Sequence, residues 1–241
     1  MNLGKMADLT KIINQNYITE RIDKECERRR VSRSHLGLST CGHNCQRYLW
    51  YTHNNYPQTP ISGRILRLFE LGNILEESIR RDFMNAGFAM CSDQAEVSFD
   101  YTDPETAKKY VLVGHIDGIV SGLDESEKPH LWECKTAGDK AFKKLIKLNS
   151  YEAWNEKYKF QVHAYMLGMN LDRAIVTVYC KNDSNLYQER IKLNKDYILK
   201  GLEAVFRTIG LDSPPDRTCP RAEWWESKFC DYRESCWNGK I

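Results

Sequence analysis

Gly-His-Ile-Asp-Gly at residues 114–118 and Trp-Glu-Cys-Lys-Thr at residues 132–136 are the two segments that decide the fold. Side chains alternate faces along a strand, so Glu133 and Lys135 should project together. Charged groups on an otherwise apolar strand are costly to bury unless they are paired or bind a metal. Asp117 belongs to the preceding apolar run, where a cross-strand neighbour would be close enough to share an ion. The two segments predict adjacent strands with a charged site between them.

The chemistry of this site suits a hard divalent cation. Two carboxylates, Asp117 and Glu133, together with the backbone carbonyl of Cys134, are ligands that favour Mg²⁺ or Mn²⁺. Such an ion can activate water and neutralise the charge that develops on a phosphodiester. Lys135 would hold the attacking water or stabilise the transition state. The alternative from the residues alone is a structural Glu–Lys or Asp–Lys pair.

Two further helical segments contribute polar side chains. Glu76 lies on a helix stripe that is otherwise apolar, one turn after Gly72, whereas Glu77 falls on the polar stripe. If one of these two glutamates binds metal, we expect it to be Glu76; a paired core glutamate is the alternative. Gln161 and Tyr165 are four residues apart and share a helix face, and both can hydrogen-bond a phosphate, a base or a carboxylate.

Outward from these segments, hydrophobic periodicity predicts the remaining elements. A polar helix over residues 6–30 is followed by an irregular stretch over 31–60. The middle of the chain is predicted as helix, three strands, helix, strand, strand and helix, over residues 63–86, 95–99, 110–121, 130–136, 151–169, 174–179, 186–193 and 195–209.

The order of these motifs resembles the PD-(D/E)XK nuclease superfamily, in its RecB-like branch of phage recombination and CRISPR-associated exonucleases. The resemblance rests on Gly72 to Glu76, residues 114–118, residues 132–136 and Gln-Val-His-Ala-Tyr at 161–165, and it covers roughly residues 34–209. Four motifs in order are far more specific than one.

The resemblance implies an α/β fold with a mixed central sheet flanked by helices. In this fold a nuclease domain at 34–211 would follow an N-terminal helical extension at 1–33. A Cys-rich tail at 212–241 would pack back on the N-terminal side.

The resemblance also implies an activity and residue roles. Glu76, Asp117 and Glu133 would bind metal, Lys135 would be catalytic, and Gln161 and Tyr165 would position substrate or brace the site. The branch often has histidine where this chain has Glu76, so the site would be all-oxygen. Plausible phosphate contacts are Arg47, Arg64 and Arg67.

The resemblance implies a DNA exonuclease of phage recombination or replication, because residues 37–51 and 64–73 also resemble phage members. A single-strand annealing or other recombination protein would be its partner. A flap or other structure-specific endonuclease on the same core is the first alternative. A non-catalytic DNA-binding subunit is the alternative from another class.

Nine cysteines are many for a chain without a secretory signal, and in a reducing cytosol metal ligation is the leading use for any that gather. Iron–sulfur members of the branch place one cysteine before the core and three after it, spaced C-x2-C-x5-C. The spacing of Cys230 and Cys236 fits, but Ser227 stands where the first of the three belongs. Cys219 could supply that ligand, with Cys45 from the N-terminal side.

A structural 4Fe–4S cluster, a Zn²⁺ ion and no metal at all stay open as alternatives for these cysteines. Cys41 is a substitute candidate for Cys45. The other cysteines are interpreted as packing residues: Cys26, Cys91, Cys134 and Cys180.

The remaining features of the sequence set limits on location and partners. The net charge is +2, and no apolar run approaches the length of a bilayer or of a signal-peptide core. We therefore expect a cytoplasmic protein, in the host cytoplasm if it is phage-encoded. Two basic clusters are either phosphate contacts or solvated helix faces: Arg28, Arg29, Arg30 and Arg33, and Lys140, Lys143, Lys144 and Lys147.

Overall fold

The computed structural model describes residues 15–30, 35–123 and 128–239. The chain divides into two units, one of residues 1–32 with 60–74 and one of residues 33–59 with 75–241. No helix of the described residues is long and apolar enough to cross a membrane.

The smaller unit contains α2 (Gln15–Arg29) and the beginning of α5 (Gly63–Asn85). An ion pair between Arg67 and Asp23 joins the two helices. The Gly63 N–H also donates to Glu27 Oε1 at 2.9 Å. The predicted helix over 6–30 is confirmed from residue 15 onward, and its first residues lie outside the described part of the chain.

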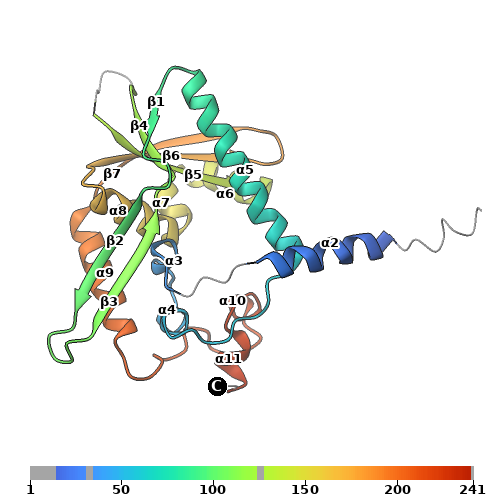
Figure 1. Cartoon of the computed structure of the whole chain (residues 1–241), viewed down its shortest axis with the longest axis vertical. Helices are drawn as coiled ribbons and strands as arrows, with labels where there is room; N and C mark the ends of the chain where they lie inside the picture. The colour runs from blue at the N-terminus through green and yellow to red at the C-terminus, as the bar shows by residue number, and fades with distance from the viewer. Residues whose placement is uncertain (1–14, 31–34, 124–127, 240–241) are drawn as a thin grey trace, which may run out of the picture. The chain divides into compact units, whose positions relative to one another are not determined.

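A five-stranded sheet forms the centre of the larger unit, in the order β1-β4-β5-β6-β7 (Figure 1). Its strands are β1 (Ala89–Cys91), β4 (Gly118–Ser121), β5 (His130–Ala137), β6 (Arg173–Cys180) and β7 (Leu186–Lys192). Neighbouring strands are antiparallel except β5 and β6, which are parallel and are joined through helices. The sheet is therefore mixed, as expected.

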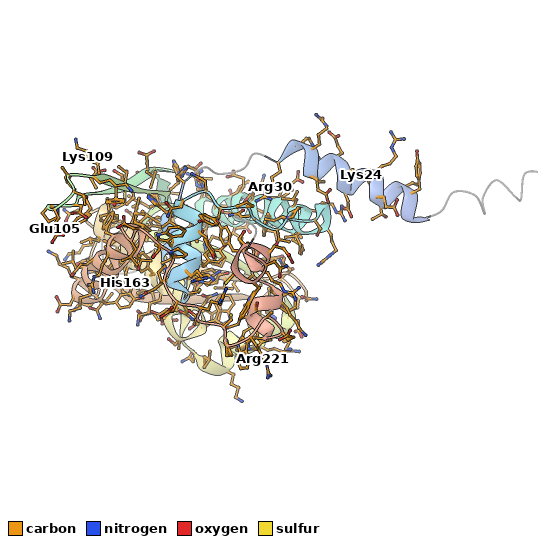
Figure 2. All side chains as sticks on the ribbon, turned by 90° about the horizontal axis from the view of Figure 1, so that it is seen from below. Lys24, Arg30, Glu105, Lys109, His163 and Arg221 are labelled. Atoms are coloured by element: carbon orange, nitrogen blue, oxygen red, sulfur yellow. The ribbon has the colours of Figure 1, made fainter. Side chains whose placement is uncertain are left out.

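The predicted strand over 110–121 is wrong as a single element, because the chain changes sheets within it. Its first part is β3 (Lys109–His115), which pairs with β2 (Glu96–Thr102) in a separate hairpin. Figure 2 labels Glu105 and Lys109 at the turn of this hairpin. The second part is β4, which pairs with β5. The break falls at Ile116 and Asp117, and Ile116 is fully buried there. Both halves bury apolar side chains, which is why hydrophobic periodicity alone predicts one strand here.

Helices cover both faces of the five-stranded sheet. On one face, α8 (Glu156–Gly168) and α9 (Lys195–Ile209) bury the larger core with side chains such as Leu131 and Val176. On the other face, Ile79 and Phe83 of α5 pack with Trp132. Figure 1 shows this arrangement of layers. The predicted helices over 63–86 and 195–209 are confirmed.

The helix predicted over 151–169 is divided into α7 (Tyr151–Trp154) and α8. Asn155 has extended backbone angles, and its side chain accepts the Lys157 N–H at 3.0 Å, so it caps a new helix. Helix α6 (Asp139–Leu148) was not among the predicted elements. The supposedly irregular 31–60 stretch contains two short helices, α3 (Leu38–Cys41) and α4 (Gln46–His53).

The tail packs against α4 and the residues that follow it. It contains α10 (Trp225–Lys228) and α11 (Arg233–Trp237). Tyr48 donates to Asp231 Oδ2 at 2.6 Å, and Trp50 Nε1 donates to the Leu211 carbonyl at 2.8 Å. Trp50 also joins Tyr51 and Tyr232 in a small aromatic core. These contacts clasp residues 48–59 to residues 211–235.

Candidate active site

The site begins on β5, where Glu133 and Lys135 lie on the same face as predicted. Glu133 is fully buried and Lys135 is four-fifths buried, and the two form an ion pair through Glu133 Oε1. The second carboxylate oxygen, Oε2, is buried without a hydrogen-bond partner among the described residues. A buried oxygen in this state costs free energy unless a ligand occupies it. Glu133 therefore has one coordination position to offer.

Asp117 lies against the same strand. It directly precedes β4, where Gly118 is paired with Trp132 of β5. Its Oδ2 accepts the backbone N–H of Cys134 at 2.8 Å, which fixes the carboxylate next to Glu133. The Cys134 side chain points to the opposite face, into the cluster around Trp132. The expected neighbourhood of Asp117 and Glu133 is thus present, although Asp117 lies at the junction of two sheets and not within a strand.

Glu76 reaches the site from α5. It is half-buried, whereas Glu77 is exposed, in agreement with the assignment of the two stripes. Gln94 donates to Glu76 Oε1 at 3.3 Å. Asp93, next to Gln94, accepts a hydrogen bond from Arg80 at 3.0 Å and raises the pKa of both Glu76 and Asp117. Asp93 and Gln94 were not singled out in the sequence because a short exposed turn carries no periodic signal.

The charges of these side chains shift one another's pKa values. Burial, reinforced by the charge of Asp117, raises the pKa of Glu76 to about 7. Burial raises the pKa of Glu133 to about 8 although Lys135 opposes the rise, with Asp117 and Glu76 adding to it. Burial also raises the pKa of Asp117. Burial alone would lower the pKa of Lys135, but the carboxylates of Glu133 and Asp117 raise it well above its usual value.

Gln161 and Tyr165 lie on α8, and both side chains are buried. Tyr165 passes over Gly114, where an added Cβ would meet the phenol oxygen at 2.7 Å and Leu38 Cβ at 2.9 Å. This close approach explains why glycine precedes the His-Ile-Asp segment. Burial, and then the charge of Glu133, raises the pKa of Tyr165, so its ring lies within the field of the site.

Two tyrosines beside Lys135 were not predicted. The Lys135 ammonium lies 5.4 Å from the ring centre of Tyr158, and that ring stacks on Tyr151 with centroids 5.9 Å apart. Tyr151 is fully buried, and its hydroxyl has no hydrogen-bond partner among the described residues. Burial and then the Glu133 charge raise its pKa. Tyr151 lies in the short helix α7 and Tyr158 in the first turn of α8, and the boundary between these two helices was not predicted.

The donor set of this site fits a divalent cation. Within the described residues, no three His, Cys, Asp or Glu side chains converge tightly enough to form a finished metal cage. The unpartnered Glu133 oxygen nevertheless lies in a group of three carboxylates and one ammonium. When all are ionised, that group carries a net charge of −2, which one divalent ion would neutralise. Oxygen donors of this kind suit Mg²⁺ or Mn²⁺.

Comparison with known proteins bears on the fold. No family model matches the sequence, and no curated protein sequence matches it. The crystal structure of SSO0001 has a TM-score of 0.50 and 16% sequence identity, and the match covers 91% of this chain and 96% of that chain. An alkaline exonuclease (LHK-Exo) from Laribacter hongkongensis has a TM-score of 0.48 and 14% identity, covering 77% and 90% of the two chains. The likeness to SSO0001 concerns the fold alone, a mixed sheet flanked by helices.

Three of the four candidate cysteine ligands line a cavity in the larger unit, although no three His, Cys, Asp or Glu side chains among the described residues lie close enough together to hold a metal ion. Cys45, Cys219 and Cys230 line a cavity of about 510 Å³. Burial and then the charge of Cys45 raise the pKa of Cys219, with a smaller contribution from Cys236. Burial raises the pKa of Cys230 to about 11, and Cys45 and Cys236 contribute to this rise. Cys45 therefore lies in the same cavity lining as Cys219 and Cys230, which come from the C-terminal tail.

The other cysteines and Ser227 have different surroundings. Ser227 is buried, and its hydroxyl accepts the Trp237 Nε1–H at 2.7 Å, so this serine has a packing role outside the cavity lining. Cys41 belongs to the main core, which favours Cys45 as the candidate ligand. Cys134 and Cys180 are buried as expected. Cys91 is exposed, so its interpretation as a packing residue is wrong.

The three arginines proposed as phosphate contacts differ in availability. Arg47 Nε donates to the Pro215 carbonyl at 2.5 Å, so this side chain secures the tail. Arg67 is paired with Asp23 in the smaller unit. Arg64 is exposed on α5. Arg64 is the one of the three for which the described contacts assign no structural task.

Proposed function

We propose that this protein is a divalent-metal-dependent DNA exonuclease that hydrolyses phosphodiester bonds. The observation that carries the proposal is the buried, unpartnered Glu133 Oε2 beside Asp117, Glu76 and the Lys135 ammonium. Its role would be in phage DNA recombination or replication, in the host cytoplasm, with a single-strand annealing or other recombination protein as partner.

Glu76, Asp117 and Glu133, with the carbonyl of Cys134, would hold Mg²⁺ or Mn²⁺. When bound, this ion would supply Lewis-acid activation of water and neutralisation of phosphate charge. Asp117 is held in place by the Cys134 N–H, so its free oxygen is oriented before any ligand arrives. A site fixed in this way loses little orientational freedom on binding.

Lys135 would act on the reacting atoms directly. Its ammonium is protonated at neutral pH, because the carboxylates of Glu133 and Asp117 hold its pKa high despite burial. A protonated ammonium can donate to the attacking water or to a phosphate oxygen as negative charge develops. Gln161 and Tyr165 would brace the site, since both are buried on α8. Tyr165 packs against Gly114, and the charge of Glu133 contributes to its raised pKa after burial.

Incubation with two DNA substrates tests the proposal. Purified protein with Mg²⁺ is expected to degrade end-labelled linear duplex and to leave a covalently closed circle of the same sequence intact. EDTA should stop the reaction, because the carboxylates alone cannot activate water.

The same experiment separates the alternatives. Cleavage of the closed circle would replace the exonuclease with a structure-specific endonuclease on the same core. Tight DNA binding without any metal-dependent cleavage would favour a non-catalytic DNA-binding subunit and end the proposal.

We propose further that Cys45, Cys219, Cys230 and Cys236 hold a structural 4Fe–4S cluster, with Zn²⁺ as the alternative occupant. The support is the cavity that three of them line and the mutual influence of the thiols. Because these cysteines come from both ends of the clasp, a bound group would add its binding free energy to folding.

Elemental analysis of anaerobically purified protein tests the cysteine site. Wild-type protein is expected to be brown and to contain iron and sulfide, and Cys230→Ser should lose them. Cys91→Ser is the matched control, since Cys91 is exposed on β1 and should leave the metal content unchanged. Colourless protein with stoichiometric zinc would replace the cluster, and wild-type protein without any metal would refute the site.

A further inference from the structure

The most basic helix of the larger unit is α6, which directly follows the strand that carries Glu133 and Lys135. It contains four lysines and one aspartate, so it has a net charge of +3 within ten residues. The whole chain of 241 residues has a net charge of +2. The positive charge is therefore concentrated on α6, because the chain as a whole is close to neutral.

The lysines form one stripe along the helix. Lys140, Lys143, Lys144 and Lys147 follow a spacing of three and four residues and are all exposed. Phe142 and Leu145 face the core instead. Among the described residues only Lys143 has an acidic partner, Asp139 at 3.0 Å. The stripe extends about 10 Å from its first to its last lysine at 1.5 Å per residue.

A short series of contacts connects α6 to Lys135. The Ala141 carbonyl accepts the Trp154 Nε1–H at 3.1 Å. The Trp154 ring lies 5.4 Å from that of Tyr158, over which the Lys135 ammonium lies at 5.4 Å. Helix α6 therefore lies next to the end of β5 and is linked to Lys135 through Trp154 and Tyr158 (Figure 1).

We propose that the lysine stripe of α6 binds the sugar-phosphate backbone of double-stranded DNA and guides it toward Lys135, an inference that rests on the proposed nuclease function. Charge complementarity selects a polyanion, since duplex DNA presents a dense row of phosphates. The single aromatic side chain of α6, Phe142, is buried. Binding of single strands relies on exposed aromatic rings that stack on bases, and α6 has none.

The stripe also determines what kind of recognition is expected. Lysine ammonium groups contact phosphates as point charges and do not distinguish base pairs. Binding through α6 should therefore be independent of sequence and steeply dependent on salt. This property fits an enzyme that must move along a DNA strand while it removes successive nucleotides.

Fluorescence anisotropy of full-length protein with labelled DNA, in EDTA to prevent cleavage, tests the proposal. Lys144→Gln/Lys147→Gln is compared with Lys195→Gln/Lys200→Gln, a control that removes two exposed lysines from α9. The α6 variant is expected to bind duplex about tenfold more weakly. Its plot of log Kd against log salt should be shallower by about 1.8, which is about 0.9 for each phosphate that the protein no longer neutralises. The control should match the wild type.

Parallel measurements separate this proposal from the proposed function. If wild-type protein cleaves DNA and the α6 variant binds duplex with unchanged Kd and salt slope, the stripe is refuted while the nuclease stands. A loss confined to single-stranded DNA would also refute it. If the wild type neither binds nor cleaves DNA, both proposals fail. Thermal melting of the variants checks that the loss does not arise from unfolding.

Discussion

Lys135→Ala is expected to lower the rate of DNA cleavage by about a hundredfold to a thousandfold, because removal of one preorganised donor from a buried site has an effect of about that size. The substitution leaves Glu133 and Asp117 in place and removes one positive charge from their surroundings. Binding of Mn²⁺ should therefore remain as tight as in the wild type or become tighter. Single-turnover cleavage and calorimetric titration with Mn²⁺ measure these two effects separately.

Asp117→Asn provides the contrast. It keeps an acceptor for the Cys134 N–H but removes a carboxylate, so both cleavage and Mn²⁺ affinity should fall. Lys200→Ala on α9 is a control that should leave both unchanged. Cleavage by Lys135→Ala within a few fold of the wild-type rate would refute a catalytic role for this lysine.

Binding of Mn²⁺ is expected to tighten steeply as the pH rises from about 6 to about 8, because the ion and protons compete for the same carboxylates. Burial raises the pKa of Glu133 to about 8 and that of Glu76 to about 7. Each proton displaced should strengthen binding about tenfold per pH unit below the pKa of its group. Calorimetry in two buffers with different ionisation enthalpies counts the protons released.

The metal-free protein should show the opposite dependence on pH. A carboxyl group whose pKa is higher in the folded chain stabilises the fold while it is protonated. The contribution of Glu133 is complete below its unfolded pKa of 4.5 and is lost as the pH rises through about 8. In EDTA, Tm should decline over this interval, and saturating Mn²⁺ should raise Tm most at the alkaline end. Mn²⁺ affinity that does not change with pH would contradict the assignment of these ligands.

The part of the site that could be predicted from sequence is the part set by strand alternation. Glu133 and Lys135 had to share a face once β5 was recognised, and Glu76 had to lie on the inward stripe of α5 because Ile79 and Phe83 do. The break between β3 and β4 was not predicted, because apolar side chains are buried along both strands and the run was interpreted as one element. The sequence therefore placed Asp117 beside β5 without revealing that it lies at a junction between sheets.

Contacts between short segments that are distant in the chain could not be predicted from local sequence patterns. Tyr151 lies in a helix of four residues, and its approach to Lys135 depends on how α7 packs against α6 and α8. Asp93 affects Glu76 from an exposed turn. The hydrogen bond between Trp237 and the Ser227 hydroxyl joins two residues of the tail and could not be expected from the cysteine spacing. Each of these relations exists only once the three-dimensional packing is formed.

The clasp between α4 and the tail has a consequence for biosynthesis. The Trp50 indole N–H donates to the carbonyl of Leu211, which lies 161 residues further along the chain. A ribosome delivers residues in order, so the indole of Trp50 emerges long before that carbonyl has been translated. During this interval the nascent chain exposes an aromatic surface that chaperones can bind, and closure of the clasp is one of the last events of folding.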